Sequence, residues 1–187
     1  MTSALIIVFR EMLEMALGLG VLFAATKGMR ESRRWIASGV GAGAVGALLF
    51  ALFMDEIEGA ASGDGEFIFN AAVLAIASVL IAWTVLWMGR HGREMAEKMR
   101  HVGQSVVDGD APKTALAVVA AAAVMREGGE AVFFLFGAAQ AVPDDGVSMF
   151  IGSVMGMLLG GLTAYVVYRG LVRIPLNYVF GVAGWLL

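Results

Sequence analysis

Residues 10–14 read Arg-Glu-Met-Leu-Glu and residues 126–130 read Arg-Glu-Gly-Gly-Glu, and each stretch lies inside a long run of apolar residues. Both stretches have the pattern Arg-Glu-x-x-Glu. At about 100° per residue in an α-helix, the arginine and both glutamates of each motif fall within one stripe of the helix surface. Each motif therefore predicts a helix that carries one charged stripe on an otherwise apolar surface.

The composition around the motifs is that of a membrane protein. Of the 187 residues, 59% are hydrophobic and 16% are charged, and the mean hydropathy is +0.81. Apolar runs of about 20 residues, each long enough to cross a hydrocarbon core of about 30 Å, recur along the chain. We expect an all-α, polytopic membrane helix bundle in a single domain, with membrane helices at 3–26, 35–54, 67–89, 114–141, 148–168 and 174–187.

Composition also excludes several kinds of partner and site. The chain has no cysteine, so disulfides and thiolate metal sites are excluded, and its net charge of -3 does not suggest a nucleic-acid partner. The first apolar run follows no basic segment, so we expect this helix to remain in the mature protein and not to be cleaved as a signal peptide.

The charged residues between the apolar runs divide by sign. The first, third and fifth connections contain lysine and arginine, whereas the second and fourth contain acidic residues and no basic ones. Because cytoplasmic loops are enriched in basic residues, we expect a cell-membrane protein with its amino terminus outside. The second connection contains five acidic residues that either gather cations at the outer mouth or only complete the charge pattern: Asp55, Glu56, Glu58, Asp64 and Glu66.

The two motifs lie in the first and fourth membrane helices, which this topology runs in opposite directions. We therefore expect a 3+3 inverted repeat, with repeat one at 1–89, a cytoplasmic connection at 90–113 and repeat two at 114–187. The connection is predicted to form an interfacial helix followed by a Gly-Asp turn, with a solvated loop as the alternative. Glycines at helical spacing in the second and fifth helices predict close helix packing: Gly39, Gly43 and Gly46, and Gly152, Gly156 and Gly160.

Six ionisable groups inside a membrane need a compensating interaction, since together they cost on the order of 15 to 20 kcal/mol. Structural salt bridges at i, i+4 spacing, Arg10 with Glu14 and Arg126 with Glu130, are one explanation. They leave Glu11 and Glu127 without a cationic partner inside the apolar runs. We therefore favour a site in which all four carboxylates face a cation.

Carboxylate oxygens favour hard cations, whereas copper(I) prefers sulfur ligands. Four carboxylates and two guanidinium groups sum to -2, which a divalent or a trivalent cation can balance, so charge alone does not identify the metal. The chain has neither the Glu-x-x-His pairs of di-iron bundles nor the His-Glu-x-x-His motif of zinc proteases. We expect a transporter and not an enzyme.

The paired motifs, the stretch IAWTVLWM at 81–88 and the stretch AVFFLF at 131–136 resemble the high-affinity iron permease family, the oxidase-dependent iron transporters of fungi and bacteria. The resemblance implies uptake of ferric iron (Fe3+) as the transported substrate, with no permanently bound cofactor. It also implies an outer-face oxidase or a periplasmic iron donor as partner. By the same resemblance, the iron ligands are Glu11, Glu14, Glu127 and Glu130, and Arg10 and Arg126 hold and tune them.

The sequence departs from the family pattern in three places. The motif interiors, Met12-Leu13 and Gly128-Gly129, differ from the usual Gly-Leu, and Asn70 occupies a position where bacterial relatives are expected to have glutamate. The family usually has a seventh helix, and the sequence stops at Leu187 within an apolar run, so we expect a piece of a longer protein.

Two functions remain as alternatives to iron transport. One is a permease for manganese or lead, and the other is a non-transporting scaffold held by Arg-Glu pairs.

Overall fold

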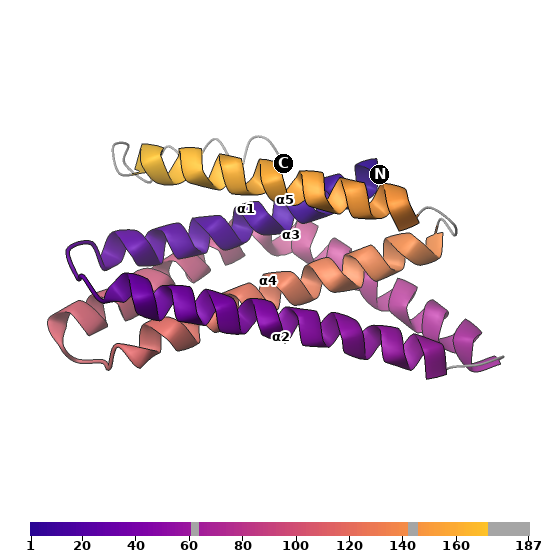
Figure 1. The fold of residues 1–187 in the computed structure, drawn as a ribbon, viewed down its shortest axis with the longest axis horizontal. Helices are drawn as coiled ribbons and strands as arrows, with labels where there is room; N and C mark the ends of the chain where they lie inside the picture. Colours follow the sequence, from indigo (N-terminus) through magenta and orange to yellow (C-terminus); the bar gives the residue numbers. More distant parts are fainter. Residues whose placement is uncertain (61–63, 142–145, 172–187) are drawn as a thin grey trace.

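The computed structural model describes residues 1–60, 64–141 and 146–171, which form five helices and no strand (Figure 1). The helices are α1 (Thr2–Ala25), α2 (Ser32–Ala60), α3 (Asp64–Asp108), α4 (Thr114–Ala141) and α5 (Gly146–Leu171). The predicted all-α class is confirmed. The sixth helix expected at 174–187 lies outside the described residues.

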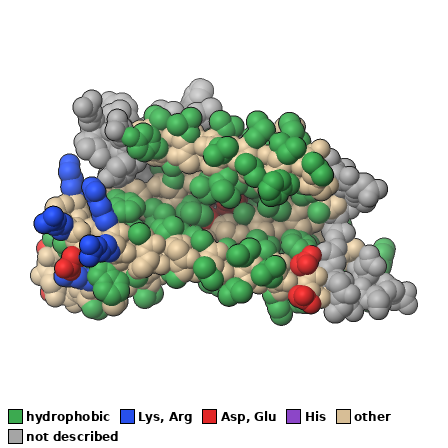
Figure 2. Space-filling view, viewed as in Figure 1, with side chains coloured by type: hydrophobic (Ala, Val, Ile, Leu, Met, Phe, Trp, Pro, Cys, Tyr) green, Lys and Arg blue, Asp and Glu red, His purple; other side chains and the backbone are tan. Residues whose placement is uncertain are grey.

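The described helices have the surface expected of a membrane bundle. Two segments are long and apolar enough to cross a membrane, Ser32–Ile57 of α2 and Gly146–Val166 of α5. Helices α1 and α4 carry three charged motif residues each, which interrupt otherwise apolar sequences. Figure 2 shows apolar side chains along the length of the bundle, with basic side chains gathered at one end beside an acidic one, and acidic side chains without basic ones at the other.

The ends of the bundle are defined here by these charges. The basic end carries exposed side chains of the α1–α2 connection, of the first turn of α2 and of the residue before α4: Lys27, Arg30, Arg33, Arg34 and Lys113. The acidic end carries the exposed Asp55 and Glu56 of α2. Helix α1 runs from the acidic end to the basic end, and α4 runs the opposite way (Figure 1).

Two helix pairs, α1 with α5 and α2 with α4, pack with their backbones in contact. A Cβ atom added at Gly43 of α2 would lie 2.6 Å from the carbonyl oxygen of Ala121 in α4. One added at Gly156 of α5 would lie 2.6 Å from the carbonyl oxygen of Leu5 in α1. Only residues without a side chain allow helices to approach so closely. The prediction that these glycines serve close packing is confirmed.

The two pairs use equivalent positions. A Cβ atom at Gly43 would also lie 2.8 Å from Cβ of Val124, and one at Gly156 would lie 3.1 Å from Cβ of Val8. Val124 and Val8 each stand two residues before the arginine of their own motif. Each motif helix is therefore seated on its glycine-bearing partner in the same register.

The main buried apolar cluster among the described residues lies toward the basic end and draws on α1, α2, α3 and α4. It consists of Val21, Leu22, Ile36, Met99, Val106, Leu116, Ala120 and Ala123. The side chains of Leu22, Ile36 and Leu116 are 0% exposed. Burial of this kind contributes about 1.5 to 3 kcal/mol for each large apolar side chain in water. The cluster therefore holds the basic ends of these four helices together.

Helix α3 has 45 residues and continues without a break into the expected connection. At 1.5 Å per residue it is roughly 68 Å long, more than twice the hydrocarbon thickness of about 30 Å. The part that was expected to form a separate interfacial helix packs through Met99 and Val106 against the cluster described above. The helix ends at Gly109, whose φ of 87° suits only glycine, and the amides of Asp110 and Ala111 donate to Ser105 O at 2.9 and 3.0 Å. The predicted Gly-Asp turn is present.

Candidate metal centre

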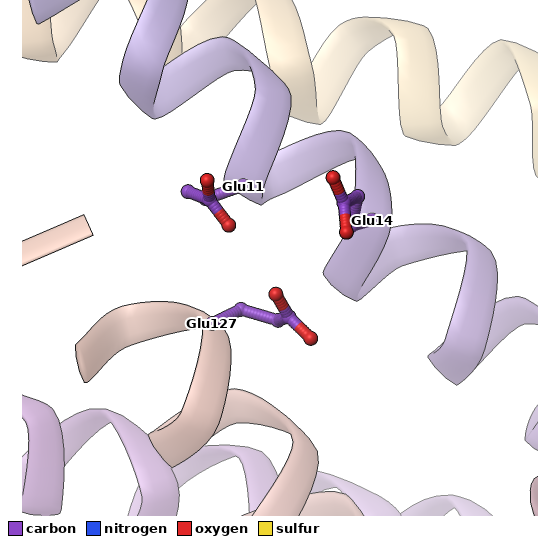
Figure 3. Close-up of side chains that lie close together, drawn as sticks. All are labelled: Glu11, Glu14 and Glu127. Carbon is purple, nitrogen blue, oxygen red and sulfur yellow. The ribbon is translucent and has the colours of Figure 1, made fainter. Parts of the chain in front are cut away.

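The two motifs meet near the middle of the bundle. Glu11 and Glu14 extend from α1, Glu127 extends from α4, and the three side chains point toward one another (Figure 3). One carboxylate oxygen of each residue lies within 4.8 Å of the others. Glu11 is 2% exposed and Glu127 is 7% exposed. The structure thus brings together three of the four carboxylates predicted from the sequence.

Helix packing explains why the glutamates face each other. Within the first motif, Met12 contacts α5, because a Cβ atom at Gly160 would lie 2.6 Å from Cβ of Met12. Within the second motif, Gly128 contacts α2, because a Cβ atom there would lie 2.6 Å from Cβ of Ala47. In each motif, the residue after the first glutamate therefore contacts the partner helix, α5 or α2. The side of the motif helix that carries the glutamates then faces the other motif.

The predicted salt bridges are confirmed in both motifs. Arg10 Nε donates to Glu14 Oε1 at 3.0 Å, and Arg126 Nε donates to Glu130 Oε1 at 3.2 Å. The arginines also approach the first glutamates, at 3.9 Å for Arg10 and Glu11 and at 4.0 Å for Arg126 and Glu127. The expectation that Glu11 and Glu127 have no cationic partner is therefore corrected: a guanidinium lies nearby, at a distance too long for a hydrogen bond.

Several buried oxygens of the three-carboxylate group Glu11, Glu14 and Glu127 have no hydrogen bond within the described part of the chain. Both carboxylate oxygens of Glu11 and Oε2 of Glu127 are buried and have no hydrogen-bond partner among the described residues. Burying a carboxylate without such partners is costly in free energy. A cation bound among these oxygens would compensate for the lost hydration.

The donor set fits a hard cation. The three residues offer carboxylate oxygens only, which iron, manganese, magnesium and calcium ions accept as ligands. Oxygens that bind one such ion at about 2.0 to 2.6 Å lie no more than about 5 Å apart, so the observed spacing is compatible with a shared ion. Among the side chains that the structure describes, no other group of three acidic or histidine residues lies this close together.

The remaining predicted residues lie elsewhere. Glu130 is not part of the three-carboxylate group and is held by Arg126. Asp55 and Glu56 are exposed at the acidic end, and the side chains of Glu58 and Glu66 are outside the described part of the chain. Asn70 lies in α3, and its buried Oδ1 atom has no hydrogen-bond partner among the described residues.

Comparison with known proteins gives evidence that is independent of this geometry. The whole chain, residues 1–187, matches the model of the Iron permease FTR1 family. It is 30% identical over 179 residues to proteins named ferrous iron permease EfeU from Escherichia coli O6:K15:H31 (strain 536) and Shigella sonnei (strain Ss046). These alignments cover 94% of this chain and 64% of each relative. The protein of the same name from Yersinia pestis is 27% identical over 179 residues, with 94% and 62% covered. The chain therefore spans less than two thirds of the length of these relatives, and no solved structure matches it.

Proposed function

The chain belongs to the iron permease FTR1 family, and from that premise we propose that it carries iron across the cell membrane through the carboxylates of its two motifs. One observation carries the proposal. Glu11 is 2% exposed, both of its oxygens lack hydrogen bonds among the described residues, and it faces carboxylates from its own helix and from α4. A cation is the ligand that such a group is suited to bind. Glu11, Glu14, Glu127 and Glu130 are the proposed iron ligands.

The arginines act on the site without binding the metal. A guanidinium group does not bind metal ions. Each arginine instead holds one carboxylate by a hydrogen bond, and its positive charge reduces the net negative charge of the empty site. An empty cluster of four carboxylates would otherwise repel itself strongly at low dielectric. Arg10 and Arg126 therefore keep the site folded between transport cycles.

Ferric iron is the proposed cargo. A site with oxygen ligands alone suits the harder ferric ion better than it suits ferrous iron, which also accepts imidazole and sulfur. The relatives reported above are named as ferrous iron permeases, so ferrous iron is the second cargo to be measured. The donor is proposed to be an oxidase or a periplasmic iron-binding protein at the outer face, where Asp55 and Glu56 lower the local electrostatic potential.

The proposed topology places the amino terminus and the acidic end outside and the basic end in the cytoplasm. Its support is the separation of charge along the bundle in Figure 2 and the positive-inside rule. The equivalent contacts of Gly43 and Gly156 support an inverted repeat, with units at 1–89 and 114–187 joined by 90–113. The site lies near the middle of the repeat interface, as expected for a secondary transporter.

A scaffold without transport would keep the same two Arg-Glu hydrogen bonds, so those bonds do not distinguish the two functions. Glu11 and Glu127 do, because neither accepts a hydrogen bond from the arginine of its motif. Glu11→Gln and Glu127→Gln keep the size of the side chain and remove one negative charge each. We expect both variants to insert into the membrane and to lose iron uptake.

The assay is uptake of radiolabelled iron by vesicles that contain the chain, with ferric citrate, anaerobic ferrous iron and Mn2+ measured in parallel. Glu97→Gln is the matched control, since Glu97 is an exposed carboxylate of α3 that lies far in sequence from all four motif glutamates. Uptake at the unmodified rate by well-expressed Glu11→Gln and Glu127→Gln proteins would contradict the proposal in favour of the scaffold. Preferential uptake of Mn2+ would contradict the choice of metal.

A further inference from the structure

The two motifs have the same internal geometry but different roles in the cluster. The Arg-Glu hydrogen bonds measure 3.0 and 3.2 Å, and the longer contacts to the first glutamates measure 3.9 and 4.0 Å. Nevertheless, Glu14 belongs to the three-carboxylate group and its counterpart Glu130 does not. The side chain of Arg10 is 19% exposed, whereas that of Arg126 is 40% exposed. The asymmetry therefore arises from how α1 and α4 are set against each other and not from the motifs themselves.

Each motif belongs to a pair of helices that must move together. Along α5, Cβ atoms at Gly156 and Gly160 would lie 2.6 Å from atoms of α1, and one at Gly152 would overlap the carbonyl oxygen of Met1, the residue before α1. Along α2, Cβ atoms at Gly43 and Gly46 would lie 2.6 and 3.2 Å from atoms of α4, and one at Gly39 would overlap the carbonyl oxygen of Ala117 in α4. Close contact over several successive turns, with backbone atoms in most cases, resists sliding within a pair. A change at the site is therefore a shift of one pair against the other.

The directions of the helices give the glutamates different depths. Glu14 lies three residues nearer to the basic end than Glu11, because α1 runs toward that end. Glu130 lies three residues nearer to the acidic end than Glu127, because α4 runs the opposite way. Three residues of helix correspond to about 4.5 Å along the axis. The observed group is thus completed by the carboxylate on the basic side.

We propose that Glu11, Glu127 and Glu130 form a second metal position, displaced toward the acidic end, and that iron passes from it to the observed position of Glu11, Glu14 and Glu127. The inference rests on the proposed function and assigns the four carboxylates separate tasks. Glu11 and Glu127 bind the ion in both positions. Glu130 receives the ion on the acidic side, and Glu14 replaces Glu130 as the ion moves inward.

This exchange of one ligand suits the physics of the site. A hard cation that kept two carboxylates while it exchanged the third would not need to be released into the low-dielectric interior, where a bare ion is very costly. Each exchanging carboxylate also has an arginine, Arg10 or Arg126, that accepts it as a hydrogen-bonding partner when the metal has left it. The apolar cluster that includes Leu22 and Leu116 lies on the basic side of these carboxylates.

The test separates iron binding from iron transport. The purified protein in detergent, with radiolabelled ferric citrate as probe, reports equilibrium affinity, and vesicles report uptake. For Glu14→Gln we expect affinity to fall at least about tenfold, as is usual when a metal site loses a supporting group. For Glu130→Gln we expect the iron affinity to change by no more than about twofold, which is much less than the tenfold loss expected for Glu14→Gln. Both variants should lose most of their uptake, and Glu97→Gln should change neither quantity.

Equal loss of affinity in Glu14→Gln and Glu130→Gln would overturn the inference in favour of one static site with four ligands, and so would normal uptake by Glu130→Gln. The proposed function would survive either result. It fails separately if Glu11→Gln binds and carries iron normally. If Glu14→Gln does not elute as a folded protein in size-exclusion chromatography, Glu14→Asp and Glu130→Asp replace the pair, because they keep the charge and shorten the reach, and the same inequality of affinities is required.

Discussion

Replacing Gly43 by alanine tests the helix pairing that positions the site. The new Cβ atom would lie 2.6 Å from Ala121 O, 2.8 Å from Val124 Cβ and 3.1 Å from Ala121 Cα, all of which belong to the packed face of α4. Two of these atoms are backbone atoms of a helix, so relief requires α2 and α4 to separate. Overpacking of this kind typically costs about 1 to 3 kcal/mol.

Gly41 provides the matched control on the same helix. A Cβ atom there would have nothing within 4 Å, so Gly41→Ala changes helix propensity without changing packing. Alanine is favoured over glycine in a helix by up to about 1 kcal/mol. Because both variants gain the same helix propensity, they should differ by the overpacking cost alone, roughly 1 to 3 kcal/mol in stability, with Gly43→Ala the weaker protein.

The assay is the thermal midpoint of the purified protein in detergent, followed by the fraction that remains monodisperse after heating. For a chain of this size each kcal/mol changes the midpoint by about 2 to 4 °C, so Gly43→Ala should fall below Gly41→Ala by at least about 2 °C. Iron affinity should fall with it, since the separation of α2 and α4 displaces Glu127. Equal midpoints for the two variants would refute the close backbone contact and the rigid pair inferred from it.

Three further predictions concern the ends of the bundle and its apolar cluster. A membrane-impermeant thiol reagent applied to intact cells should label Asp55→Cys and not Lys27→Cys, both of which are exposed positions, and the reverse pattern would contradict the topology. Leu22→Ala should lower stability by about 2 to 5 kcal/mol, whereas Leu48→Ala, at a residue 60% exposed, should change it little, and similar midpoints would contradict the buried cluster. The hydrogen bond and charge of Lys113 hold the pKa of the exposed Glu31 carboxyl below its ordinary value of 4.5, so the pair stabilises the fold above that value and this contribution is lost as the pH falls through the lowered pKa. Lys113→Ala should therefore flatten the acid side of the stability profile below pH 4.5, and an unchanged profile would show that the pair is not formed.

Much of the helical architecture follows from the sequence because it depends on local properties. The span expected at 114–141 coincides with α4, and the span expected at 3–26 differs from α1 by one residue at each end. The span expected at 35–54 is too short, since α2 extends from Ser32 to Ala60. Hydropathy locates the part of a helix that suits lipid, whereas the hydrogen-bonded helix continues into charged residues that can be solvated.

The structure of the expected connection at 90–113, most of which belongs to α3, depends on tertiary packing. Because the segment is rich in charged residues, its hydropathy does not reveal the apolar positions Met99 and Val106. Both side chains are buried against α1 and α4, and this packing keeps the segment helical. The sequence alone favours a helix for this mixed-charge segment but leaves a solvated loop as the alternative.

The candidate site was predictable in its residues and not in its asymmetry. Spacing alone indicates that Arg10 can reach Glu14 and that Arg126 can reach Glu130, and both hydrogen bonds are present. Whether Glu14 or Glu130 completes the group with Glu11 and Glu127 depends on the relative depth and tilt of two helices whose motifs lie more than 100 residues apart in the sequence. No pattern within either motif contains that information.

The central claim is that carboxylates from both motifs bind the transported iron, and anomalous scattering from iron-soaked crystals tests it most directly. Data collected on both sides of the iron absorption edge report the position of the metal independently of the protein phases. The account predicts an iron peak enclosed by the carboxylates of Glu11, Glu14 and Glu127, and its loss in crystals of the Glu11→Gln protein. An iron peak elsewhere in the bundle, with these three carboxylates unliganded, would contradict it.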